Sequence, residues 1–196
     1  MDVVTPVYDD SYASALATLP KYSQPNYISE AGDLVFTVTS RDGVGNLRFG
    51  GGDSFTLKTL RHVLIGKAQE ASTSDIILAM NSSSEDGAYN GHVIEITEGT
   101  GEGQRANVQN YFGETRKAVA TFASKPDSSS EYVVGIEEEM RVQALGNGYF
   151  LARPQLTISS NYTLWVQLSG TTHIHGSPFH VYVGASKFSA ADSYVK

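Results

Sequence analysis

Residues 161–183 read NYTLWVQLSGTTHIHGSPFHVYV and contain the two most regular strand patterns of the chain. Successive side chains of a strand point to opposite faces, so Leu164 and Val166 share one face and Trp165 takes the other. We therefore expect Leu164 and Val166 in a core and Trp165 partly exposed. Val181 and Val183 also share a face in the second pattern, which follows the strand-entry residue Pro178.

Other alternating segments extend this pattern toward both ends of the chain. Gly146-Asn147-Gly148 is a typical hairpin turn and leads into an aromatic strand. Residues 34–39 and 55–58 predict strands, and residues 41–46 and 50–53 predict turns. Together these segments predict one core from distant parts of the sequence, formed by Phe36, Val38, Tyr149, Leu164, Val166, Phe179 and Val181.

Composition supports an all-β chain and excludes several classes of function. The 196 residues include 19 glycines, 11 tyrosines and 8 phenylalanines, which suit pleated strands and tight turns. A net charge of -7 disfavours binding to nucleic acid. The absence of cysteine removes disulfides, thiolate nucleophiles and Cys-ligated zinc. No segment approaches the ~20 apolar residues of a membrane helix, and residues 1–10 predict no signal peptide.

The segments 144–150, 161–166 and 173–183 resemble the second half of a filamin-type immunoglobulin-like repeat. The family pattern is a G-x-Y turn, a Y-x-V-x-V strand and a terminal I-x-G-S-P-F-x-V-x-V. Residues 36–46 and 51–55 are similar to the second strand, its turn and the entry to the third strand. The resemblance implies a β-sandwich that binds ligand peptides as an added strand beside its third and fourth strands, here residues 54–59 and 140–145.

The two filamin-like halves are separated by an insertion, so the resemblance implies a split domain. We expect a linker at 1–7, a filamin-type sandwich from 8–60 plus 138–185, and an inserted all-β module at 61–137. Residues 87–94, 97–104 and 126–132 of the insertion are similar to β-modules of phage tails and other virion surfaces. The module should have its own core, formed by Ile77, Val93, Ile96, Val108, Val119, Phe122 and Tyr132.

Three segments are less regular. Residues 11–19 fit a short helix or a strand, and residues 61–74 hold an apolar run followed by a Ser/Thr linker. Residues 10–14 (DSYAS) recur in part as residues 192–196 (DSYVK), about one domain length away. We therefore expect residues 186–196 to be a linker and the start of a next repeat.

Candidate chemical sites have plainer structural interpretations. His173 and His175 form an H-x-H pair near His180, but no acidic ligand is local, so the pattern favours a structural role over metal binding. Residues 99–104 are glycine-rich but lack the lysine of a phosphate loop and predict a hairpin turn. Residues 137–139 are three glutamates, typical of a solvated edge, and Asp42 with Asn46 fits a calcium loop only loosely. Asn81 and Asn161 begin glycosylation sequons.

These observations predict a non-enzymatic structural or adhesive module of a tandem-repeat protein, with no cofactor, metal or catalytic residue. Its partner would be a protein or a glycan, with flanking repeats in the same chain. The alternative is a virion or tail-surface protein whose insertion binds a receptor or glycan. For a structural or adhesive module we expect an extracellular, cell-surface, cytoskeletal or ciliary location, and for the alternative a virion surface. The predicted partner-binding residues are Asn81, Asp86, Tyr89, Asn90, Thr100, Glu102, Phe55 and Leu57, of which the first six lie in two loops of the insertion.

Overall fold

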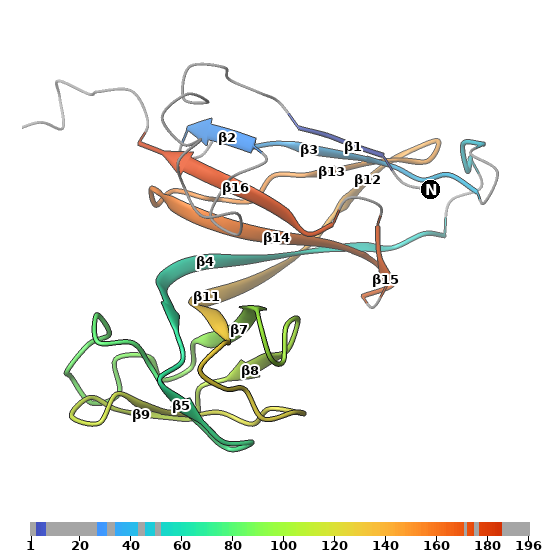
Figure 1. Cartoon of the computed structure of the whole chain (residues 1–196). Helices are drawn as coiled ribbons and strands as arrows, with labels where there is room; N and C mark the ends of the chain where they lie inside the picture. Colours follow the sequence, from blue (N-terminus) through green and yellow to red (C-terminus); the bar gives the residue numbers. More distant parts are fainter. Residues whose placement is uncertain are drawn as a thin grey trace, which may run out of the picture. The chain divides into compact units, whose positions relative to one another are not determined.

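The computed structural model describes residues 3–6, 27–30, 34–42, 46–49, 52–170, 172–174 and 177–185. Every regular element in these ranges is a β-strand, which confirms the all-β class (Figure 1). The expectations for residues 11–19 and 186–196 fall outside the described residues. Chain contacts divide the protein into two compact units. We call residues 1–59 with 139–196 the sandwich unit, and Leu60–Glu138 the insert unit.

No helix among the described residues is long and apolar enough to cross a membrane.

The sandwich unit has two sheets that share one core. The first sheet has the order β1-β3-β13-β12 and is antiparallel throughout. The second has the order β2-β16-β14-β4, with β2 parallel to β16 and with β15 paired to β14. The strands are β1 (Val3–Pro6), β2 (Tyr27–Glu30), β3 (Phe36–Thr39), β4 (Phe55–Lys67), β12 (Gln143–Gly146), β13 (Tyr149–Ala152), β14 (Ser160–Leu168), β15 (Thr172–His173) and β16 (Phe179–Gly184).

Residues from distant parts of the sequence meet in the sandwich core. Val38 of β3 is the register partner of Phe150 of β13, and both side chains point inward. Six of the seven predicted core residues lie in this core, and Tyr149 is the exception. It is 46% exposed, because β13 turns Phe150 and Ala152 inward. The prediction for Tyr149 was therefore wrong by one residue, which is enough to place a strand side chain on the opposite face.

The prediction for Trp165 was also wrong. The residue lies on the opposite face of β14 from Leu164 and Val166, yet it is only 5% exposed. β14 is a central strand with β16 on one side and β4 on the other, and both of its faces are covered. A strand with two buried faces gives no exposed position for the residue that alternates out of phase.

The insert unit has a four-stranded sheet with the order β5-β6-β10-β9. It also holds the strands β4-β11-β7-β8, which belong to the same eight-stranded sheet as β2-β16-β14-β4. Residues 61–74, left open by the sequence, continue β4 to Lys67 and then form β5. β4 and β11 each run from one unit into the other. The new strands are β5 (Glu70–Ala71), β6 (Asp75–Ile77), β7 (Val93–Glu98), β8 (Arg105–Asn107), β9 (Asn110–Phe112), β10 (Lys117–Val119) and β11 (Glu131–Arg141).

The insert core is separate from the sandwich core. Of the predicted residues it contains Ile96, Val108, Phe122 and Tyr132, whereas Val93 is buried outside it. The predictions for Ile77 and Val119 were wrong, because both are only half-buried. Their neighbours Ile76 and Ala118, which are register partners, point inward instead and are fully buried.

The glycine-rich segment 99–104 is a hairpin connection, as predicted. It joins the antiparallel strands β7 and β8, and Gly99, Gly101 and Gly103 all have φ above +80°. Glycine adopts this left-handed conformation without the strain that other residues meet there. The glycine spacing therefore serves the turn.

Candidate functional site

The loop formed by residues 79–92 of the insert unit folds back onto the hairpin of β9 and β10. Gly87 N donates to Tyr111 O at 2.8 Å, and Gly91 N donates to Val108 O at 2.9 Å. The hydroxyl of Tyr111 donates to Ser83 O at 2.5 Å. These bonds connect the loop to the strand at several points, so that its side chains are held in fixed positions beside the hairpin.

Tyr89 supports this loop from inside. Its ring packs edge-on against the Tyr111 ring, with centroids 4.7 Å apart, and its hydroxyl accepts a hydrogen bond from Ser83 N at 3.0 Å. Both tyrosines are buried in the insert core. Tyr89 was predicted to bind a partner; it is only 7% exposed, and its side chain holds the loop.

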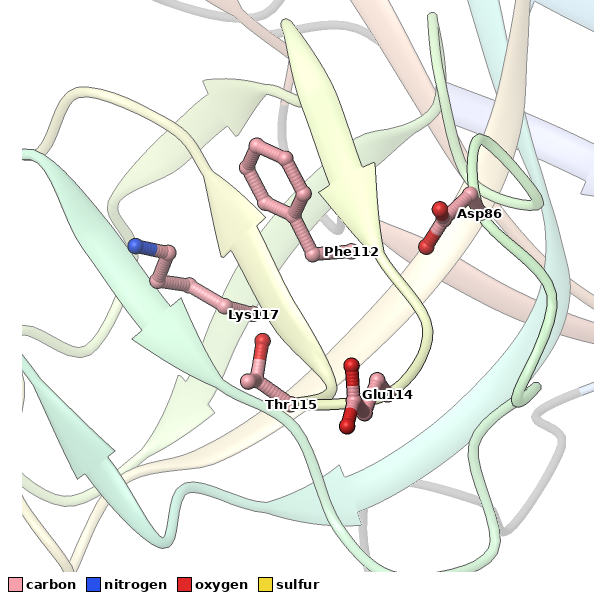
Figure 2. Close-up of a pocket in the computed structure, with 5 residues that line it drawn as sticks. All are labelled: Asp86, Phe112, Glu114, Thr115 and Lys117. Carbon is pink, nitrogen blue, oxygen red and sulfur yellow. The ribbon is translucent and has the colours of Figure 1, made fainter.

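The loop and the hairpin enclose a pocket of about 280 Å³ on the outer side of the hairpin. Figure 2 shows its five lining side chains, which come from two stretches of the sequence, the loop and the β9–β10 hairpin. Asp86 comes from the loop, Phe112 from the end of β9, Glu114 and Thr115 from the turn, and Lys117 from the start of β10. Of these residues, the sequence predicted Asp86 alone.

Register explains how the pocket side chains meet. Phe112 and Lys117 are direct cross-strand partners, and the Lys117 ammonium lies 5.4 Å from the centre of the Phe112 ring. Tyr111 and Ala118, one position inward on each strand, are fully buried, so Phe112 and Lys117 face outward. Phe112 is 40% exposed, so part of its aromatic ring borders the pocket.

A backbone contact fixes Asp86 at the rim. Its Oδ1 accepts a hydrogen bond from Gly113 N at 2.8 Å. Gly113 has no room for a side chain, since a Cβ there would lie 2.2 Å from Ser84 O. The close approach of loop and hairpin therefore requires glycine at this position, and it sets the distance between Asp86 and the turn that carries Glu114.

The second predicted loop has a different neighbour. Thr100 Oγ1 donates to Asp127 Oδ2 at 2.8 Å, and Ser130 Oγ donates to Thr100 O at 2.6 Å. Hydrogen bonds from Ser129 and Thr100 lower the pKa of Asp127. The two loops lie at opposite ends of the six-residue strand β7, which spans ~20 Å. Thr100 and Glu102 are thus not brought together with the pocket.

The remaining predicted partner-binding residues divide by exposure. Asn81 and Asn90 are exposed in the first loop, and Glu102 is exposed in the second. Phe55 and Leu57 are buried in the sandwich core, where the Phe55 ring packs 4.7 Å from that of Phe150. These two residues were predicted to bind a partner, and their side chains lie on the inward face of β4.

The other candidate sites have local partners. His173 lies within 3.3 Å of both Gln167 Nε2 and Ser177 Oγ, and burial lowers the pKa of His180. His175 lies outside the described residues. Asp42 accepts hydrogen bonds from the backbone and side chain of Asn46, which closes a turn. In the part of the chain that the structure describes, no three His, Asp or Glu side chains gather as metal ligands would.

A partly buried carboxyl group, that of Glu95, lies elsewhere in the insert unit. Glu95 of β7 is the register partner of Arg105 on β8, and Arg105 forms an ion pair with Glu137 of β11. Burial raises the pKa of Glu95 from 4.5 to about 7. The positive charge of Arg105 lowers this pKa in part, and the negative charge of Glu137 raises it further. Glu137, predicted as part of a solvated edge, is half-buried in this ion pair.

This pKa predicts how stability depends on pH. The folded state holds the Glu95 proton more tightly than the unfolded state, so the free energy of unfolding should fall as pH rises from about 4.5 through about 7. This difference in pKa corresponds to a loss of roughly 3 kcal/mol in the free energy of unfolding. Glu95→Gln should remove this dependence and make the insert unit more stable than wild type at pH 8. Hydrogen exchange of insert amides at pH 5 and pH 8 measures the stability of the wild type and of Glu95→Gln. If both lose the same stability between these pH values, the prediction is contradicted.

No family model, curated protein or solved structure matches the chain.

The sequence missed Phe112, Glu114, Thr115 and Lys117 for a definable reason. The pattern of residues 106–111 predicts a strand, which ends one residue before the exposed ring of Phe112. A signal was available, since an inward Tyr111 implies an outward Phe112 on the same strand. The contribution of Asp86 to the same pocket depends on loop hydrogen bonds that no periodicity reveals.

Proposed function

We propose that the protein is a non-enzymatic structural module in which a filamin-type immunoglobulin-like sandwich acts as a spacer and the insert unit carries recognition. The module belongs to a larger tandem-repeat protein and docks a partner. The observation that carries the proposal is the strand order of the sandwich unit, together with the position of the insertion within it.

The strand order supports an immunoglobulin-type sandwich. In that class, strands A, B, E and D form one sheet and strands C, F and G form the other. Taken in chain order, β1, β3, β4, β12, β13, β14 and β16 occupy positions A to G. The two sheets then have the orders A-B-E-D and G-F-C, with β2 added beside β16. The insertion separates β4 from β12, so it lies between C and D.

The outer edge of β4 supports a transfer of recognition to the insertion. β4 pairs with β14 on one side and β11 on the other. Val142, directly after β11, donates from N to Phe55 O at 3.0 Å. A peptide added as a strand needs unpaired backbone groups along an edge. Residues 54–59 therefore offer a poor docking edge, whereas the loops of the insert unit are exposed.

A second candidate function is favoured by the pocket of the insert unit. An exposed ring with carboxylate and amine neighbours suits a receptor or glycan, as expected of a virion or tail-surface protein. The two candidates share the insert as the recognition element, and they differ in the assembly that the sandwich unit serves.

The test compares two sets of variants in the full chain. Asn81→Ala with Asn90→Ala changes the first loop, and Ser54→Ala with Lys58→Gln changes the strand. We expect the loop set to weaken binding at least about tenfold, a loss of about 1.4 kcal/mol, and the strand set to leave it intact. Binding of each variant is measured by pull-down from extracts of the organism that makes the protein, and by attachment to the surfaces of its cells. Loss of binding in the strand set alone would reverse the assignment.

A further inference from the structure

The pocket formed by Asp86, Phe112, Glu114, Thr115 and Lys117 has features that specify the chemistry of a ligand. From these we propose that it binds one neutral sugar ring of a glycan. The inference rests on the proposed role of the insert unit in recognition and adds the class of ligand. It does not depend on which assembly the sandwich unit serves.

The size of the pocket fits a single ring. Pockets for drug-sized ligands have volumes of ~300–1,000 Å³. At about 280 Å³, this pocket lies just below that range. A monosaccharide unit is smaller than a drug-sized ligand, and the remainder of a longer glycan would extend into solvent, because the pocket is open.

Phe112 supplies an apolar surface for the ligand. Its side chain is 40% exposed and stands on the outward face of β9. A pyranose ring has one face of C–H groups and a rim of hydroxyls, so it can cover an aromatic side chain and still present polar groups to the walls. Burying part of an aromatic ring in this way is favourable in water.

The polar walls select for a neutral ligand with hydroxyl groups. Ionised Asp86 and Glu114 only accept hydrogen bonds, whereas Lys117 only donates them. A hydroxyl can do both, so one sugar ring can satisfy all three side chains. An anionic ligand would meet the repulsion of two carboxylates, and a cationic ligand would meet that of the Lys117 ammonium.

The pocket is preorganised. Asp86 is held by Gly113 N, the loop is tied to Tyr111, and Lys117 is aligned with Phe112 by the strand register. Side chains that are already ordered lose less conformational entropy on binding. This allows a small ligand with few contacts to bind measurably, in the millimolar range typical of weak complexes.

The test is an NMR titration of the ¹⁵N-labelled full chain. The neutral probes are the methyl glycosides of galactose, glucose and mannose, and N-acetylglucosamine. The charged probes are N-acetylneuraminic acid and N-acetylarginine amide. We expect at least one neutral probe to shift the backbone amides of Asp86 and residues 112–117 with a saturable dependence, and both charged probes to bind at least about tenfold more weakly.

Matched variants identify the contacts. Phe112→Ala and Glu114→Ala should each weaken binding of the neutral probe at least about tenfold. Val63→Ala removes an exposed apolar side chain, and Glu138→Ala removes an exposed carboxylate, both from the insert unit outside the pocket. These two controls should leave binding unchanged. Amide spectra away from the pocket show whether each variant retains the wild-type fold.

Several results would overturn the inference. If N-acetylarginine amide shifts the pocket amides and no sugar does, the pocket accepts a cationic side chain, and the role of the insert in recognition still stands. If no probe shifts them while the loop variants lose the partner, recognition lies elsewhere in the insert. If Phe112→Ala weakens sugar binding no more than Val63→Ala, the aromatic contact is refuted. Loss of the proposed function itself is detected separately, by the loop and strand variants.

Discussion

Phe36→Ala is expected to lower the free energy of unfolding of the sandwich unit by about 3–5 kcal/mol, as large-to-small changes of buried aromatic residues do. Phe36 is fully buried on β3, and its ring centroid lies 6.1 Å from that of Phe179 on the facing sheet. The substitution removes a contact between the two sheets and leaves a cavity that close-packed strands fill poorly.

Trp165 makes this effect measurable. It is the single tryptophan of the chain, and it is buried in the sandwich unit, so its fluorescence during urea unfolding reports on that unit. Tyr149→Ala is the matched control, because Tyr149 is an exposed aromatic residue of the same sheet; its cost should stay within about 0.5 kcal/mol. Equal costs for the two variants would contradict the assigned core.

Ile76→Ala should destabilise the insert unit by about 2–5 kcal/mol. Ile76 is fully buried on β6, where Ala118 of β10 is its register partner. The two core clusters share no residue, so the tryptophan-detected transition of the sandwich unit should change much less. Hydrogen exchange of insert amides, measured beside the fluorescence transition, separates the two responses.

Ile77→Ala is the control for this prediction. The substitution Ile77→Ala shortens the same type of side chain at the adjacent position. Ile77 is only half-buried, because it lies on the other face of β6. Its cost should therefore be clearly smaller than that of Ile76→Ala. If Ile77→Ala costs more, the strand is assigned to the wrong face, and the sequence-based choice of Ile77 would be restored.

The sequence predicted where strands form better than which way they face. Alternation placed Val38 and Val181 on the correct faces, because threonine, histidine or tyrosine residues stand between the core positions of their strands. It chose wrongly between Tyr149 and Phe150, and between Ile76 and Ile77, because apolar residues are adjacent in these strands. In such a run the register with the neighbouring strands decides the face, and one sequence does not contain that information.

The candidate site was harder to predict for another reason. Asp86 and Lys117 are 31 positions apart, and their proximity depends on Gly113, whose missing side chain admits the loop. The sequence indicated that the loop was exposed, but exposure alone did not distinguish Asn81 and Asn90 from Tyr89, which is used internally. Contacts of this kind arise from tertiary packing, which local propensity does not encode.

The two strands that connect the units have a consequence for how such a protein can diversify. β4 leaves the sandwich unit and β11 returns to it as hydrogen-bonded neighbours, so their backbones are separated by one strand spacing, ~4.8 Å. Any module whose two ends are equally close could replace residues 60–138 without requiring the sandwich to change its connections. The neighbouring strands β4 and β11 are therefore a place where one inserted module could be exchanged for another, by recombination or by design.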